Sequence, residues 1–202
     1  MKDLVVLVAD KDMEYALRGL LERPQDLGIQ AIEYDLFVHP RHDPGCLRES
    51  QDFLRPWSKT YHCALVMFDR EGCGQEQESP HELADRVKEQ LERNGWSYCE
   101  AVVLAPELEV WVWSNSPHVE DCLGWANREP SLRAWLATNG HWPVDVPKPP
   151  QPKKVLEAAL REVGKPRSSA IYLALAKSVS PRRHSEPSFL RFTQALQEWF
   201  PP

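Results

Sequence analysis

The chain has 202 residues, of which 42% are hydrophobic and 27% are charged. This length and composition predict a globular protein with a buried core, and they exclude an intrinsically disordered chain. No apolar run approaches the roughly 20 residues that a membrane-spanning helix needs, so we expect no membrane segment. The opening stretch, MKDLVVLVADKD, meets acidic residues too early for a signal peptide, and we expect it to form the first strand.

The cysteines and the charges narrow the class of protein further. The five cysteines are odd in number and include no Cys-x-x-Cys pair, which favours reduced thiols in a cytoplasmic protein over disulfides or structural zinc. From Lys148 onward there are ten basic and four acidic residues, whereas the first 147 residues have fourteen basic and twenty-six acidic ones. This division fits a metal site beside a phosphate-binding surface. It fits equally well an acidic domain that packs against its own basic C-terminal segment.

Hydrophobic periodicity predicts alternating strands and helices. Strands are expected at 3–9, 29–39 and 63–69, with a fourth that begins at residue 100, because these runs are apolar and rich in β-branched residues. Helices are expected at 12–22, with Asp12 as N-cap, and at 79–95, where Ser79 and Glu82 form a capping box. The alternation is typical of a parallel sheet with helices on its faces.

The segments between these elements are less regular. Residues 40–46 are interpreted as a loop, 47–54 as an ambiguous stretch that a short helix would fit, and 131–140 as a short helix. The proline-rich run 142–154 predicts a stiff linker. Three helical stretches follow, at 153–164, 169–179 and 188–200. We therefore divide the chain into an α/β domain, 1–146, and a linker with a helical C-terminal extension, 147–202.

Acidic residues follow three of the four predicted strands. They are Asp10 and Asp12 after the first, Asp69 and Glu71 after the third, and Glu107 and Glu109 in the fourth segment. The carboxyl ends of parallel strands meet at one edge, where ligands of such sheets bind. Carboxylates are the hard oxygen ligands that Mg²⁺ and Mn²⁺ prefer, and such an ion can activate water and hold a phosphate for phosphodiester cleavage. The sequence therefore predicts a divalent-metal site at this edge.

The stretch DREGCG, which begins at Asp69, is central to this hypothesis. Residues two apart in an extended backbone point to the same side, so Asp69 and Glu71 would present two carboxylates together if this end stays extended. Gly72 and Gly74 would allow a sharp turn or the close approach of a phosphate. The alternative is an ordinary solvated turn.

Other polar residues have both a functional and a structural interpretation. His39, His42 and Asp43 follow the second strand, and they would suit a transition metal or a phosphate, or form plain polar surface. A basic group would meet phosphates or remain solvated; it consists of Lys153, Lys154, Arg182, Arg183 and His184. Trp111 and Trp113 are expected in the core rather than as base-stacking platforms.

Four motifs resemble those of Toprim-like proteins, the metal-binding fold of topoisomerases, primases and OLD-type nucleases. In chain order they are LVADKDMEYALRGLL, FDREGCG in the position of the Toprim Asp-x-Asp motif, ELEVWVWSN as a Glu-x-Trp motif, and PKKVLEAAL with SFLRFTQAL as the C-terminal helices. They span most of the chain, and they resemble most a small bacterial Toprim-related family. The resemblance implies a parallel sheet of about four strands flanked by helices, with a C-terminal helical extension.

The resemblance also implies roles for individual residues. Asp69 and Glu71 would bind Mg²⁺ or Mn²⁺, and Glu109, with Glu107 as an alternate, would match the glutamate of Glu-x-Trp. Ala9 stands where Toprim enzymes have a glutamate that acts as general acid, general base or metal ligand, and Asp10 is the candidate replacement. The implied catalytic residues are therefore Asp10, Asp69 and Glu71.

Two functions of different classes follow from the resemblance. The first is a metal-dependent nuclease or nuclease-like subunit of a bacterial anti-phage defence system, with DNA and other defence subunits as partners. The second is an inactive Toprim-like domain that serves as a protein-interaction subunit of a defence complex, which Ala9 favours. Another metal-dependent phosphotransfer or phosphohydrolase activity is a third interpretation, because acidic residues alone do not define the leaving group.

Overall fold

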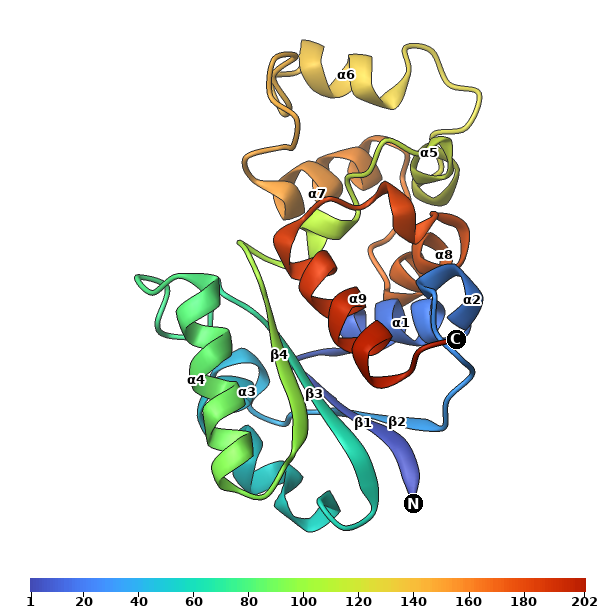
Figure 1. The fold of residues 1–202 in the computed structure, drawn as a ribbon. Coiled ribbons are helices and arrows are strands. Elements are labelled where there is room, and N and C mark those ends of the chain that lie inside the picture. Colours follow the sequence, from blue (N-terminus) through green and yellow to red (C-terminus); the bar gives the residue numbers. More distant parts are fainter.

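The computed structural model describes residues 1–202 and shows an α/β fold built on a four-stranded sheet (Figure 1). The strands are β1 (Lys2–Val8), β2 (Tyr34–Val38), β3 (Tyr61–Asp69) and β4 (Tyr98–Leu104). All of them run parallel, in the order β2-β1-β3-β4. This confirms the predicted α/β class and the parallel sheet of four strands flanked by helices.

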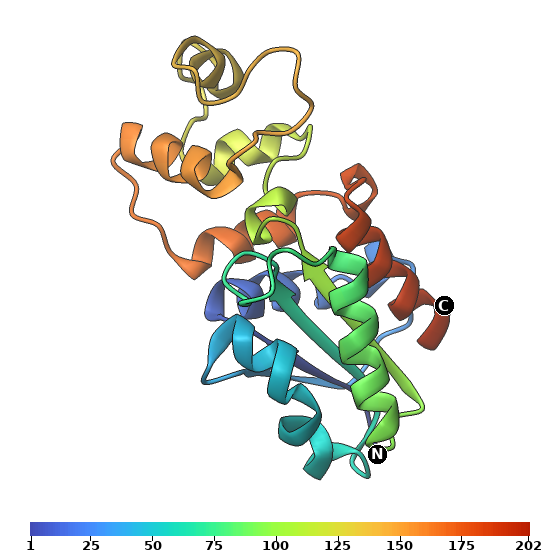
Figure 2. The same cartoon turned by 90° about the vertical axis from the view of Figure 1, so that its left-hand side faces the viewer.

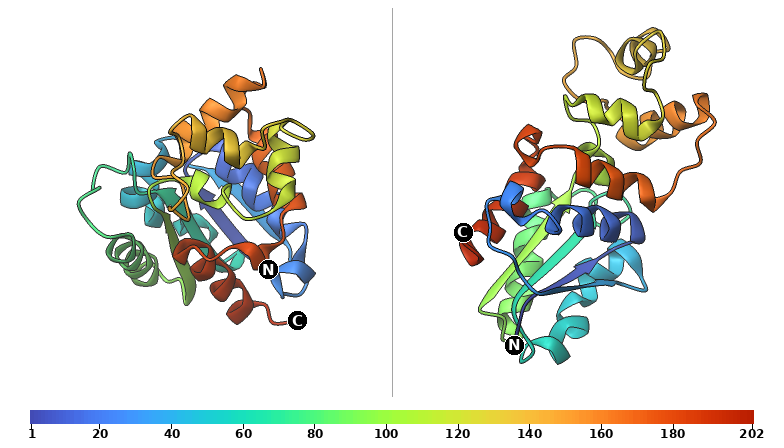
Figure 3. Two further views of the ribbon diagram at one scale, coloured as in Figure 1. Left: turned by 90° about the horizontal axis from the view of Figure 1, so that it is seen from above. Right: turned by 90° about the vertical axis from the view of Figure 1, so that its right-hand side faces the viewer.

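Helices cover both faces of the sheet. Helices α3 (His42–Leu54) and α4 (Pro80–Arg93) lie on one face, and α1 (Lys11–Leu21), α8 (Ser169–Ser178) and α9 (Pro187–Trp199) lie on the other (Figures 1 and 3). The remaining helices are α2 (Pro24–Leu27), α5 (Pro117–Leu123), α6 (Leu132–Thr138) and α7 (Pro152–Glu162), with short 3₁₀ turns η1 (Arg55–Trp57), η2 (Leu108–Trp111) and η3 (Pro181–Arg183). Helices α5, α6 and α7 extend beyond the carboxyl ends of the strands (Figure 2).

The two central strands explain the continuous apolar runs in the sequence. Residues 4–8 of β1 and 63–68 of β3 have no exposed surface, since each strand is flanked by another and covered on both faces. After β1 the chain adds β2 on one side of β1, and it then adds β3 and β4 on the other side. The carboxyl ends of β1 and β3 therefore form the topological switch point, where ligands of such sheets bind.

Several sequence predictions hold at the level of single residues. Ser79 caps α4, its hydroxyl accepting from the Glu82 N–H while the Glu82 carboxylate accepts from the Ser79 N–H, so the capping box is confirmed. Strand β2 is shorter than the predicted run 29–39, which begins in irregular backbone.

The predicted starts of two helices were also wrong. Helix α1 begins at Lys11, and its N-cap is Asp10, whose side chain accepts from the Met13 N–H; the predicted cap, Asp12, lies within the first turn. Helix α3 begins at His42, so the interpretation of 40–46 as a loop fails from that residue onward. Pro44 in its first turn is compatible with a helix, because the first N–H groups of a helix have no partner inside it.

The C-terminal segment is part of the same hydrophobic core as the sheet. The three predicted helices are present as α7, α8 and α9, and buried residues of all three join one core cluster with the strands. Helix α8 packs against α1, and α9 packs beside β4 (Figure 3). None of the helices combines the length and the apolar character needed to cross a bilayer.

Candidate functional site

Strand register places Asp10 beside Asp69. Val8 pairs with Met67 across the neighbouring strands β1 and β3, and each aspartate lies two residues beyond its member of that pair. Parallel strands are about 4.8 Å apart, so the two acids leave the sheet side by side at the switch point. The prediction that acids after the first and third strands meet at one edge is thus met for Asp10 and Asp69.

A third acid, Asp43, approaches this pair from helix α3. It lies in the first turn of α3, which follows β2, and its Oδ1 accepts from the Asp69 N–H over 2.8 Å. Burial and the Asp10 charge raise the pKa of Asp43, and the Asp69 N–H partly opposes that increase. Sequence alone placed Asp43 after a strand but gave no reason to prefer it over His39 or His42.

Asp69 is a buried acid with an oxygen that no donor satisfies. Its side chain is buried, and its Oδ1 has no hydrogen-bond partner. Burial raises the pKa of Asp69 well above its ordinary value, and Asp43, Glu109, Asp10 and Glu107 raise it further. No cationic group lies within ion-pair distance of it, so the fold concentrates negative charge around Asp69 without a direct counter-ion.

Glu71 does not accompany Asp69 in this structure. Strand β3 ends at Asp69, and Glu71 lies in an exposed turn, so the extended backbone that would align the two carboxylates is absent. The turn is closed by Glu76, whose Oε1 accepts from the N–H groups of Gly72 and Gly74, both with positive φ. The glycines are therefore explained by the turn itself.

Glu109 is buried at the edge of the group and already has partners. Its Oε1 accepts from the Tyr172 hydroxyl over 2.6 Å and from the Arg167 guanidinium over 3.0 Å. Burial raises the pKa of Glu109, the Tyr172 hydrogen bond and Arg167 oppose this, and Glu107 adds to it. Arg167 also pairs with Asp12 over 2.7 Å, so one guanidinium joins α1, η2 and the loop before α8.

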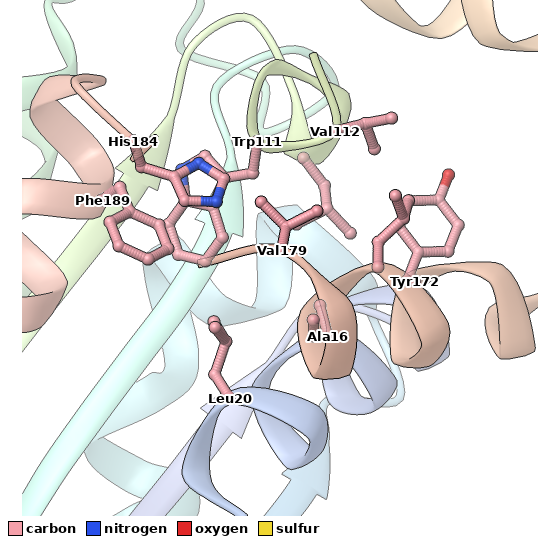
Figure 4. Close-up of a pocket in the computed structure, with 11 residues that line it drawn as sticks. Ala16, Leu20, Trp111, Val112, Tyr172, Val179, His184 and Phe189 are labelled. Carbon is pink, nitrogen blue, oxygen red and sulfur yellow. The ribbon is translucent and has the colours of Figure 1, made fainter. Parts of the chain in front are cut away.

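The η2 turn, which includes Glu109, packs against α1 and α8 through apolar side chains. Leu108 and Trp111 of η2 lie over α1 and α8 beside His184 and Phe189, around a cavity of about 30 Å³ (Figure 4). Tyr172 rises from α8 with its hydroxyl on the side away from Trp111 and His184 (Figure 4). The prediction that Trp111 and Trp113 belong to the core is confirmed, since both are buried.

Glu107, the residue just before η2, contacts Lys153 in helix α7. Glu107 Oε1 accepts from the Lys153 N–H, and its Oε2 lies 3.5 Å from Lys153 Nζ. Burial opposes the charge of Lys153, but Glu109 and Glu107 outweigh it, and they raise the pKa of the ammonium group. The basic segment thus neutralises part of the acidic edge, as one of the two interpretations of the charge division expected.

The histidines after β2 have structural partners. His42 Nδ1 lies 2.9 Å from the carbonyl oxygen of Ala9, which links α3 to the end of β1. His39 is buried, and its Nδ1 accepts from the Arg41 N–H over 3.1 Å. Cys73, between the two glycines, is buried, and burial raises the pKa of its thiol.

The acids at the switch point do not form a complete cluster of metal ligands. No three Asp, Glu, His or Cys side chains converge on one point in the structure. The unpartnered Oδ1 of Asp69, with Asp43 and Asp10 beside it, fits the way Mg²⁺ is commonly held, by one or two carboxylates plus water and substrate phosphate. The structure therefore shows one unpartnered carboxylate oxygen, on Asp69, near two further carboxylates.

Comparisons with protein-family models, with curated proteins and with solved structures gave no match to this chain. The resemblance to Toprim-like proteins therefore rests on the four sequence motifs quoted above.

Proposed function

We propose that this chain is a Mg²⁺- or Mn²⁺-dependent nuclease or nuclease-like subunit with its metal site at Asp69. The observation that carries the proposal is the buried Asp69 carboxylate, which has one unpartnered oxygen and four acidic neighbours. A buried carboxylate of this kind is costly unless a proton or a cation accompanies it. A divalent cation would be that partner under the conditions in which the protein acts.

The residues around Asp69 have distinct parts in this proposal. When bound, the cation would polarise a phosphate and lower the pKa of a coordinated water. Asp43 positions Asp69 through its backbone N–H. Asp10 uses one oxygen to cap α1, and its other oxygen is available to accept a proton from the attacking water. Lys153, partly exposed beside Glu107, supplies a positive charge for a substrate phosphate.

The experiment is a cleavage assay with plasmid and single-stranded DNA in the presence of Mg²⁺, Mn²⁺ or EDTA. We expect cleavage only with a metal ion, and its loss in Asp69→Asn. Glu71→Gln is the matched control, because Glu71 is an acid two residues away on the exposed turn, and this variant should keep most of the activity. Cleavage that continues in EDTA, or that survives in Asp69→Asn, would contradict the proposal.

A second candidate function is an inactive Toprim-like domain that binds other subunits. Two observations favour it. Ala9, in the position of the Toprim glutamate, is fully buried and offers no carboxylate, and Glu109 is already neutralised by Arg167 and Tyr172. This function predicts no metal-dependent DNA cleavage, and co-purification of the chain with its partners from the native host. A place in an anti-phage defence system rests on the family resemblance alone.

A further inference from the structure

A separate groove lies on the part of the molecule farthest from the amino ends of the strands. It is formed by residues 113–120, by α6, by the segment 142–148 and by residues 183–185, and we call it the α5–α6 groove. Its volume is about 790 Å³, within the range of sites that hold small organic ligands. The elements around it are those seen beyond the carboxyl ends of the strands in Figure 2. None of the acidic residues around Asp69 lines it.

Two unpaired guanidinium groups make this groove cationic. Arg133 donates to the carbonyl oxygens of Trp142 and Pro143, and Arg183 donates to that of Asn115, but neither has a carboxylate within ion-pair distance. Guanidinium groups bind phosphate and carboxylate oxygens through parallel hydrogen bonds, so unpaired ones in a groove favour an anionic ligand.

The other charges of the groove are already neutralised or tied. Lys148 pairs with the buried Glu186 and donates to the carbonyl oxygen of Trp113. Glu120, the acidic lining residue, accepts from the Leu132 N–H over 3.0 Å. Glu120 keeps its negative charge, so the two arginines leave one excess positive charge in the groove, on a chain whose net charge is −6.

Aromatic and polar groups complete the lining. Trp142 and Trp113 meet edge to face, with ring centroids 5.5 Å apart, and Arg133 lies over the Trp142 ring. Val144, at 82% exposure, leaves an apolar surface at the rim that nothing in the chain covers. The Ser114 hydroxyl is shielded from water and has no hydrogen-bond partner, which is unusual for a buried polar group.

We infer that the α5–α6 groove binds a free nucleotide. The phosphate would lie on Arg133 and Arg183, and the planar base would lie beside the Trp142 and Val144 side chains. This combination of an anion and a planar ring matches the guanidinium pair and the indoles in one groove. The site is independent of the proposed metal site, because its residues belong to different elements.

The test is calorimetric titration of the full chain with AMP, GMP and CMP in EDTA, so that no metal ion at Asp69 can recruit the phosphate. Arg183→Gln should weaken binding about tenfold or more. Arg182→Gln is the matched control, since the neighbouring arginine is exposed but does not line the groove, and it should leave the affinity unchanged. Asp69→Asn should also leave it unchanged.

The same titrations can overturn the inference. The nucleotide assignment fails if none of the three nucleotides binds saturably, or if inorganic phosphate binds as tightly as AMP. The location fails if Arg183→Gln binds as the wild type does, or if Asp69→Asn abolishes binding. Nucleotide binding and nuclease activity are tested separately, because the titrations contain no metal ion and the cleavage assay uses no variant of the groove.

Discussion

The backbone N–H of Asp69 donates to the carboxylate of Asp43 over 2.8 Å, which joins the end of β3 to the start of α3. The two residues are 26 positions apart in the sequence and come from opposite sides of the switch point. Through this contact the fold brings a second carboxylate beside a buried one. Burial raises the pKa of both groups, and the Asp43 charge raises that of Asp69 further. Such an arrangement costs stability, and a cation would remove much of that cost.

The first prediction concerns the pH dependence of stability. Because the folded state raises the pKa of Asp69 and Asp43 above their ordinary values, it binds more protons than the unfolded state in the range above pH 4. The free energy of unfolding should therefore fall as pH rises from about 4 through the raised folded-state pKa values, with roughly 1.4 kcal/mol for each pKa unit.

Asp69→Asn removes one of these titrations and should be more stable than the wild type at pH 7. Urea unfolding of both proteins at several pH values measures the effect. Equal pH slopes for the two proteins would show that Asp69 is not the strained carboxyl that the structure describes.

The second prediction concerns Arg167. Arg167→Ala leaves the buried Glu109 and the nearby Asp12 without their cation, so it should destabilise the fold by about 3 kcal/mol, as expected for a broken buried pair. The double variant Arg167→Ala/Glu109→Gln should recover a large part of that loss, because no buried charge remains. Thermal and urea unfolding measure both values. A loss under about 1 kcal/mol in the single variant would mean that the ion pair is solvated.

The third prediction concerns the packing of α1 against α8. A Cβ atom added at Gly19 would lie 2.7 Å from the Cβ of Ala176 and 3.0 Å from the carbonyl oxygen of Leu173. Gly19→Ala should therefore destabilise the protein by about 1–3 kcal/mol, even though alanine favours a helix interior. Adding Ala176→Gly should reduce the loss caused by Gly19→Ala. A stabilised Gly19→Ala would mean that the two helices separate easily.

The sequence was sufficient for the sheet and for most helices, since these depend on local patterns. The buried runs of β1 and β3 lack polar residues, and the capping box of α4 is a four-residue signal. The start of α1 was misplaced by local ambiguity, because Asp10 and Asp12 are both suitable N-caps and the choice depends on how the chain leaves β1.

The candidate site was only partly predictable, because it depends on contacts between distant residues. Asp10 and Asp69 could be predicted from their places at strand ends, but the role of Asp43 depends on where α3 begins. The pairing of Glu109 with Arg167 depends on the C-terminal helices, 58 residues farther along the chain. The position of Glu71 depended on whether β3 continued past Asp69, and the Gly72 turn ends that strand.

The most direct test of the proposed metal site is calorimetric titration of Mn²⁺ into the wild type, Asp69→Asn and Glu71→Gln. The account predicts saturable binding to the wild type, a loss of affinity of about tenfold or more in Asp69→Asn, and wild-type affinity in Glu71→Gln. Because Asp69→Asn is expected to be the more stable protein, its loss of binding would not reflect unfolding. Equal affinity in the wild type and Asp69→Asn, or no binding to the wild type, would contradict the claim that Asp69 is the centre of a metal site.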